Sequence, residues 1–326
     1  MRIPNIFEFA TSELSQDAMF AWLISWADDK FLKVDPELCQ LGKKFVSLLT
    51  DFPEDTIHSI EVKRQKLHID LFVRINEKSY LIIEDKVGST IHDNQLKRYR
   101  EVIEADYKEK ADKVLGAYIK THNEPQYTLV KVLKEKYKPI DRDSILRVLD
   151  TYQGAHQLVA DYRTHLRDMT NWTNNRLTWP VKDWRWFEWQ GVYMDLEKRL
   201  GDGGWSYVPN QSGGFQCYWW HEVRIEDASI KLQFEQEKLC FKIRVPDANR
   251  RSESRNRYSR QLINLAHISH TEIQKPHFGK GLHMTIGYVG RDDLFGTGVV
   301  DVDAVVGKLH QYEKLVDLLA MQTEVG

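Results

Sequence analysis

The sequence predicts an α/β domain followed by an α+β domain, and three observations support this. Residues 66–86 form two apolar, β-branched-rich runs around a short polar turn, which is typical of an antiparallel hairpin. Residues 13–26 and 36–50 have the apolar spacing of helices. Residues 203–246 divide into short apolar segments at paired glycines, as antiparallel strands do. Because 326 residues are many for one core, we expect two domains, at 1–165 and 166–326.

The N-terminal elements follow one another in the order α-β-β-β-α-β. After the two helices we expect a first strand near 58–66, then the hairpin, then a helix that carries Gln95. A buried strand at 114–120, a short strand at 128–130 and a long helix over 143–169 complete the predicted domain. Helices and strands that alternate along the chain are typical of α/β folds.

The hairpin carries Asp70 on its first strand and Glu84, Asp85 and Lys86 at the end of its second strand. Since side chains alternate along a strand, Glu84 and Lys86 share one face and Asp85 points away from it. Two converging carboxylates suit a hard divalent cation such as Mg²⁺ or Mn²⁺. A lysine beside them can hold or polarise an attacking water. These groups are suited to cutting a phosphodiester.

This arrangement resembles the PD-(D/E)XK nuclease superfamily, with Ile69 in place of the proline that gives the motif its name. The resemblance implies a restriction-endonuclease-like fold, in which helices flank a mixed central sheet. It also implies that Asp70 and Glu84 hold Mg²⁺ or Mn²⁺, with the Asp85 backbone carbonyl as a further ligand. Lys86 would assist the nucleophile.

Two flanking segments extend the resemblance. Family members often open with a helix whose glutamate reaches the metal, and Glu13 matches it; the alternative is a first-turn acid that complements the helix dipole. Gln95 and Tyr99 are four positions apart and share a helix face. The resemblance places this glutamine beside the active site and gives the tyrosine a role in substrate contact or packing. A surface glutamine and a half-buried tyrosine are the alternative.

A surface ion pair is the structural alternative for the hairpin acids and lysine. Against it, Glu84 directly follows the largely apolar residues 80–83, which indicates an acid at the end of a core strand. A chain does not bury an acid there without a partner. Carboxylates this close repel one another without a cation, so we expect low stability around the metal-free site.

A second group of candidate residues lies in the C-terminal half. Five arginines and one acid occur within residues 250–260, and the arginines are Arg250, Arg251, Arg255, Arg257 and Arg260. This cluster suits contacts to nucleic-acid phosphates, although a solvated helix face has the same composition. The net charge of −2 does not exclude a nucleic-acid enzyme, because an acidic site offsets local basic patches.

The remaining C-terminal elements define an α+β domain that binds substrate or a partner. Strands are expected at 215–224, 229–235, 239–245 and 283–289, with helices after 260 and over 301–321. The tryptophans of 171–190 can stack on bases, but packing in a core is their commoner use. Three histidines cluster loosely without matching acids or cysteines, and we expect structural roles for them: His267, His270 and His277.

Composition is ordinary for a globular enzyme, with 42 % hydrophobic and 29 % charged residues. No apolar run is long enough to span a membrane, the N-terminus lacks a signal-peptide pattern, and three scattered cysteines do not suggest a disulfide framework. We expect a cytoplasmic, metal-dependent nuclease that acts on DNA in host defence or genome processing. RNA as substrate, an inactive nucleic-acid-binding or assembly module on the same fold, and a homodimer or partner protein bound through the C-terminal domain stay open.

Overall fold

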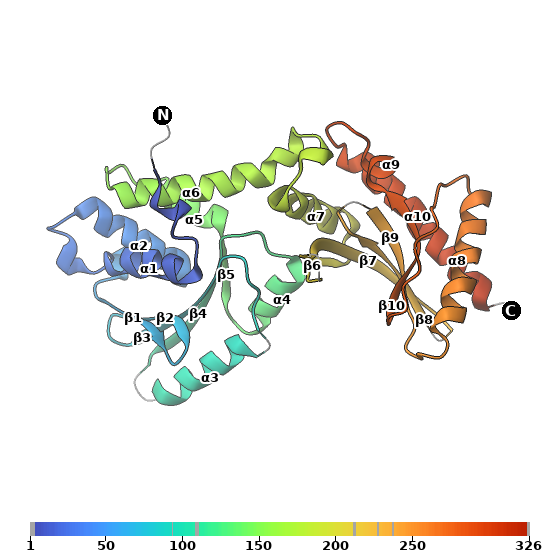
Figure 1. Ribbon diagram of the computed structural model, residues 1–326. Helices are drawn as coiled ribbons and strands as arrows, with labels where there is room; N and C mark the ends of the chain where they lie inside the picture. The colour runs from blue at the N-terminus through green and yellow to red at the C-terminus, as the bar shows by residue number, and fades with distance from the viewer. Residues whose placement is uncertain are drawn as a thin grey trace. The chain divides into compact units, whose positions relative to one another are not determined.

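The computed structural model describes residues 4–92, 94–107, 111–210, 213–226, 228–236 and 238–324. These residues form two compact units that meet in the sequence between Asn171 and Trp172, close to the boundary expected near residue 165. Each unit has its own sheet and its own helices (Figure 1).

The N-terminal unit is built on a five-stranded mixed sheet in which the strands keep their sequence order. The first three strands pair antiparallel, and the fourth and fifth add in parallel. This confirms the predicted α/β architecture with its mixed central sheet. The strands are β1 (Ile60–Lys66), β2 (Ile69–Ile75), β3 (Ser79–Lys86), β4 (Lys113–Lys120) and β5 (Lys138–Asp141).

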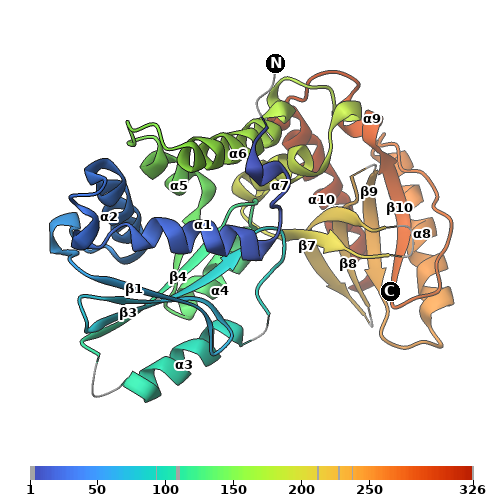
Figure 2. The same ribbon diagram turned by 60° about the vertical axis from the view of Figure 1, so that its left-hand side comes forward.

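Helices cover both faces of this sheet. In Figures 1 and 2, α1 and α2 lie on one side of the strands and α3 lies on the other. The helices are α1 (Glu13–Ser25), α2 (Pro36–Thr50), α3 (Gln95–Tyr107), α4 (Gln126–Lys134), α5 (Arg142–Leu149) and α6 (Gln157–Asn174). Short 3₁₀ turns occur at Ile6–Glu8, Asp29–Phe31 and Glu54–Thr56.

Local signals set where the helices begin. Ser12 caps α1 by accepting a hydrogen bond from the Ser15 backbone nitrogen at 3.3 Å. Asp35 caps α2 in the same way, and Pro36 occupies the first helical turn. The start of α1 is therefore fixed at Glu13, the residue predicted to reach the site.

The turns of the β1–β2–β3 meander place non-glycine residues in the left-handed region. Asn76 and Glu77 make the tight β2–β3 turn, with φ of 50° and 68°. Leu67 and His68 make the β1–β2 turn, with φ of 57° and 65°. Left-handed backbone is unfavourable for a residue such as Leu67, and strain of this kind clusters at functional sites. The strained turn lies directly before the strand that carries Asp70.

Two sequence predictions about this unit are wrong. Residues 128–130 belong to α4 and not to a strand: Thr128 and Val132 are buried one helical turn apart, so the apolar triplet is part of an amphipathic helix. The long helix predicted over 143–169 is two helices, α5 and α6. The break contains Gly154, a poor helix former, where a Cβ atom would lie 2.4 Å from the Tyr152 hydroxyl oxygen.

The C-terminal unit is a five-stranded antiparallel sheet in the order β10-β9-β8-β7-β6. The strands predicted at 215–224, 229–235, 239–245 and 283–289 are confirmed, and β6 is an addition. The strands are β6 (Gly204–Val208), β7 (Phe215–Ile225), β8 (Ala228–Phe234), β9 (Lys238–Arg244) and β10 (His283–Gly290). The helices are α7 (Trp186–Leu200), α8 (Arg251–Ile268), α9 (Arg291–Phe295) and α10 (Val302–Glu324), and 3₁₀ turns occur at Asn175–Leu177 and Val181–Asp183.

The tryptophans of the 171–190 segment divide between core and surface. Trp184 and Trp189 are buried in the core of the C-terminal unit, whereas Trp172, Trp179 and Trp186 are exposed. Among the described residues, no helix combines the length and the apolar character needed to cross a membrane.

A close crossing of α1 and α2 depends on Gly42. A Cβ atom at this position would lie 2.6 Å from the Ala27 nitrogen and 2.8 Å from the Leu23 carbonyl oxygen, both backbone atoms that cannot rotate away. We expect Gly42→Ala to lower the free energy of unfolding by about 1–3 kcal/mol, although alanine is normally the better helix former. Urea denaturation measures the change.

Gly307 in α10 provides the matched control, because a Cβ atom there meets nothing within 4 Å. Gly307→Ala should stabilise the protein by up to about 1 kcal/mol. Equal effects of the two substitutions would contradict the assigned crossing.

Candidate active site

The site lies where β2 begins and β3 ends. The β2–β3 pairing starts at Leu71 and Ile83, so Asp70 and Glu84 lie immediately beyond it. Asp70 is anchored to the other strand, because its Oδ2 accepts a hydrogen bond from the Asp85 backbone nitrogen at 2.9 Å. The opposing residue of β1, Gln65, has a φ of 54°, which interrupts regular strand geometry beside Asp70. The hairpin therefore brings the two predicted acids together.

Glu84 is completely buried. Its Oε1 contacts the Lys86 ammonium and accepts a hydrogen bond from Gln95 Nε2 at 2.6 Å. Its Oε2 is buried without a hydrogen-bond partner among the described residues. Burial, with the nearby charge of Asp70, raises the pKa of Glu84 to about 7. A buried carboxylate with one unsatisfied oxygen is a strong candidate to ligate a cation.

Lys86 lies among the acids. Its Nζ is 3.8 Å from Asp70 Oδ2 and 4.0 Å from Glu13 Oε2, and it donates to the Asp85 carbonyl oxygen at 3.2 Å. Burial alone would lower the pKa of Lys86, but the neighbouring carboxylates, Glu84 first, raise it. Lys86 is therefore a charged ammonium that partly neutralises the site.

Glu13 is brought to the site by the first turn of α1. Its Oε1 accepts hydrogen bonds from the Val87 nitrogen at 3.2 Å and from Ser89 Oγ at 2.5 Å, which ties α1 to the loop after β3. Its other oxygen faces Lys86. Glu13 therefore lies beside Lys86, and its role as a metal ligand stays a prediction.

Gln95 and Tyr99 form a chain of hydrogen bonds from the site to the β1–β2 turn. Besides its bond to Glu84, Gln95 Nε2 lies 3.1 Å from the Tyr99 hydroxyl, which in turn donates to the His68 carbonyl at 2.6 Å. Tyr99 is only 4 % exposed. Its buried hydroxyl supports Gln95 and the strained turn, so the prediction that Tyr99 contacts nucleic acid is corrected to packing and positioning.

Asp85 points to the opposite face of the sheet, as the strand alternation predicts. Its Oδ1 accepts from Gln16 Nε2 at 2.7 Å, and Gln16 Oε1 in turn accepts from Thr121 Oγ1 at 2.9 Å. Burial and the adjacent Asp17 raise the pKa of Asp85 well above its ordinary value. Burial also raises the pKa of Asp17, to about 6. This network holds the backbone of Asp85, whose carbonyl is the predicted metal ligand.

Lys120 and Glu124 are site neighbours that the sequence reasoning did not identify. Lys120 is the parallel register partner of Lys86 and is buried, which lowers its pKa. It donates to the Ser89 carbonyl and lies 3.2 Å from Glu124 Oε2. The sequence does carry a signal for Lys120, since it ends a buried strand just as Lys86 does.

The arginine cluster lies on and before α8, and much of it is held by internal contacts. Arg255 is 9 % exposed, donates to the Gly279 carbonyl at 2.6 Å and lies 4.5 Å from the Phe278 ring centroid. Its predicted phosphate contact is therefore corrected to a structural role. Internal contacts also hold three of the other arginines: Arg251 to the Val245 carbonyl, Arg257 to Glu226, and Arg260 to the Asn256 carbonyl. Arg250 is the N-cap residue of α8, without a side-chain capping bond. The nucleic-acid contacts of these four arginines stay predictions.

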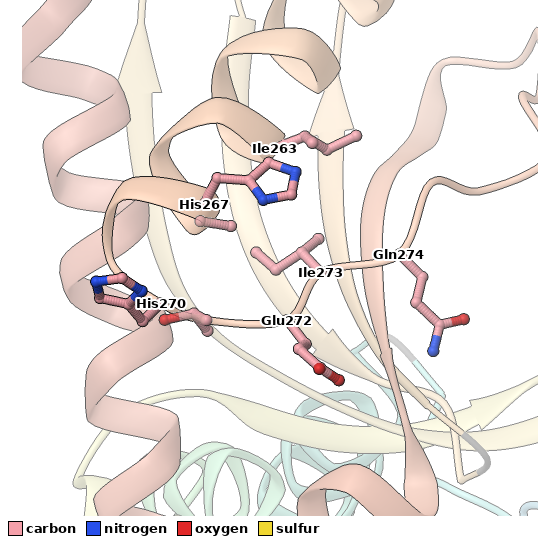
Figure 3. A pocket seen from close by; sticks show the side chains of 8 residues that line it. Ile263, His267, His270, Glu272, Ile273 and Gln274 are labelled. Carbon is pink, nitrogen blue, oxygen red and sulfur yellow. The ribbon is translucent and has the colours of Figure 1, made fainter.

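The predicted histidine cluster lies at the end of α8 and in the loop after it. His267 and His270 line a hollow of about 500 Å³. Figure 3 shows the Glu272 carboxylate pointing away from both imidazole rings. Across the residues that the structure describes, no three His, Cys, Asp or Glu side chains gather into a group that could hold a metal ion. The metal-ligand roles expected of Asp70, Glu84 and the Asp85 carbonyl therefore stay predictions.

A mixed sheet flanked by helices, with two acids and a lysine across its β2–β3 hairpin, defines a protein of the restriction-endonuclease-like class. The family model described as the PD-(D/E)XK nuclease superfamily matches residues 4–186, more than half of the chain. The chain therefore belongs to the PD-(D/E)XK nuclease superfamily. The comparisons with curated proteins and with solved structures gave no match.

The raised pKa of Glu84 makes stability depend on pH. The folded protein holds this proton up to about pH 7, whereas the unfolded chain loses it near 4.5, so stability falls as pH rises through that window. Glu84→Gln removes this dependence. In the absence of metal, raising the pH from 4.5 to about 7 should lower the free energy of unfolding of the wild type by up to about 3 kcal/mol more than that of the variant. The reason is that one pKa unit corresponds to about 1.4 kcal/mol.

Urea denaturation in EDTA across this pH range tests the assignment. Adding Mn²⁺ should raise the thermal midpoint of the wild type more at pH 8 than at pH 6, since ligands must lose their protons to bind metal. Parallel stability curves for Glu84→Gln and the wild type would contradict the environment assigned to Glu84.

Proposed function

We propose that this protein is a divalent-metal-dependent nuclease that hydrolyses phosphodiester bonds of DNA. Superfamily membership supports a nuclease-type function. The observation that carries the proposal is the convergence of Asp70, buried Glu84 and Lys86 at one end of the β2–β3 hairpin.

The donor set fits a small, hard cation. Asp70 and Glu84 supply carboxylate oxygens, one of them buried without a partner, and Asp85 supplies a backbone carbonyl. Mg²⁺ is commonly held by one or two protein carboxylates and keeps several waters, so this set is sufficient. When bound, such a cation supplies positive charge that offsets the charge gathering on the phosphodiester and makes water more acidic.

Side chains of the protein itself stabilise charge and position the groups of the site. Lys86 presents a permanent positive charge beside the two acids, where it can orient a water molecule or stabilise the attacked phosphate. Gln95 donates to Glu84 and favours its charged form. Glu13 and Lys120 hold the 87–89 loop from two sides, which keeps Lys86 in place.

Substitution of the central residues tests the proposal. Asp70→Ala, Glu84→Ala and Lys86→Ala should each lower Mg²⁺-dependent cleavage by about a thousandfold or more, because each removes charge stabilisation worth several kcal/mol. Asp106→Asn, at an exposed acid near the end of α3, is the control and should cut normally.

Digests of plasmid, linear duplex, single-stranded DNA and RNA, each with and without EDTA, provide the measurement. Circular dichroism checks that the variants fold. Cleavage that persists in EDTA, or that survives all three substitutions, would refute the site. Cleavage of RNA alone would overturn DNA as the substrate while leaving the catalytic assignment intact.

Gln95→Ala tests the positioning role separately. Loss of its bond to Glu84 should lower activity by about 10–100-fold, as for other groups that orient metal ligands. The pH profile should move to higher pH, since the charged form of Glu84 loses a donor. A lower rate with an unmoved pH profile would show that Gln95 acts only through packing.

A further inference from the structure

The sheet of the C-terminal unit has two different faces. Helices α7, α8 and α10 contribute, with alternate residues of every strand, to one large apolar core on the inward face. Figure 2 shows α8 and α10 running beside these strands. The outward face carries the other alternate residues, and these are largely basic, polar and aromatic.

The strand register arranges these outward residues in rows across the sheet. In one row Arg224 pairs with Ser229, Ser229 with Arg244, and Arg244 with His283. In the next row Lys231 pairs with Lys242, which pairs with Thr285. Basic side chains from four neighbouring strands thus lie side by side.

Fold stability does not explain this pattern. Like charges directly opposite one another on neighbouring strands are destabilising, yet Lys231 faces Lys242. Lys242 is partly compensated by Glu235, at 2.5 Å, and by Thr285 Oγ1, at 3.1 Å. Such an arrangement is expected where an anionic ligand supplies the negative charge that would offset the facing lysines.

The two rows enclose a hollow of about 220 Å³, lined by Glu222, Ser229, Lys231, Lys242, Arg244 and His283. The single acid of this lining, Glu222, accepts a hydrogen bond from Ser229 Oγ at 2.6 Å. Burial, together with the charges of Lys231 and Arg244, lowers the pKa of His283. The potential at the hollow is therefore positive even with a neutral histidine.

Aromatic rings lie in the row next to the lysines. Trp219 pairs with Gln233, which pairs with Cys240 and, through it, with Tyr288. Lys231 Nζ lies 5.6 Å from the Trp219 ring centroid, and Lys238 Nζ lies 5.8 Å from that of Tyr288. Both rings are partly exposed. Cations interleaved with rings are the features with which proteins hold single-stranded nucleic acids.

We propose that the outward face of this sheet binds a single strand of nucleic acid, with backbone phosphates over Lys231, Lys242 and Arg244 and bases against Trp219 and Tyr288. This inference deepens the proposed nuclease function and rests on it for the choice of ligand. It assigns substrate binding to the sheet face, which is a different surface from the arginine cluster of α8.

Fluorescence anisotropy of the full chain, with a labelled DNA strand of about 30 nucleotides in EDTA, tests the proposal. Lys231→Glu combined with Arg244→Glu should weaken binding at least about tenfold and reduce the salt slope by about 1.4, or about 0.7 for each lost phosphate contact. Lys198→Glu with Lys314→Glu, at exposed positions of α7 and α10, removes the same charge elsewhere and should have little effect.

Lys231→Gln with Arg244→Gln, which introduces no acid, should weaken binding less and keep the thermal midpoint of the wild type. Wild-type affinity and salt slope in both sheet-face variants, or an equal loss in the α7–α10 control, would overturn the proposal. Binding lost in the sheet-face variants while no digest shows cleavage would uphold this surface and refute the nuclease proposal. Cleavage abolished by Asp70→Ala, together with unchanged binding in the sheet-face variants, would uphold the nuclease proposal and overturn the binding surface proposed here.

Discussion

The buried carboxylate of Glu84 is the constraint on which the active site depends. A core strand delivers this acid into an apolar interior, where its charge is unfavourable unless compensated. Lys86 supplies charge from the same strand, and Gln95 supplies a donor from α3. Tyr99 then connects Gln95 to the turn that leads into the strand of Asp70. One core strand and the helix α3 thus hold one ionisable group together.

Two further acids, on the other side of the sheet, are also buried where a negative charge is unfavourable. Asp85 and Asp17 are both buried, and burial raises the pKa of each. A chain selected only for stability would replace such a pair with apolar residues. Here the pair, with Gln16, fixes the backbone of the residue whose carbonyl faces Lys86. Stability is given up locally so that the geometry of the site is maintained.

The sequence reasoning succeeded where the relevant contacts are local and failed where they are not. Strand alternation was enough to place Glu84 and Lys86 together and Asp85 apart from them. The phosphate contact predicted for Arg255 was wrong, because composition does not show that its guanidinium stacks on Phe278 and reaches the Gly279 carbonyl. The strand predicted at 128–130 was wrong, because a short apolar triplet fits a strand and a helix equally well. Lys120 was missed because its proximity to Lys86 comes from parallel pairing between strands separated by α3.

By itself, the sequence determined that Asp70, Glu84 and Lys86 come together, because a tight hairpin and a period of two make strand neighbours predictable from spacing alone. The resemblance of this acid–acid–lysine set to the PD-(D/E)XK motif then implied the superfamily and its mixed sheet. Tertiary structure decided which groups compensate one another: Gln95 and Tyr99 with Glu84, Gln16 with Asp85, Glu13 and Lys120 with the 87–89 loop. It also decided that the basic residues of β7 to β10 form one surface, since their adjacency depends on the register of four strands. Burial and long-range register are properties of the whole fold, and no short stretch of sequence specifies them.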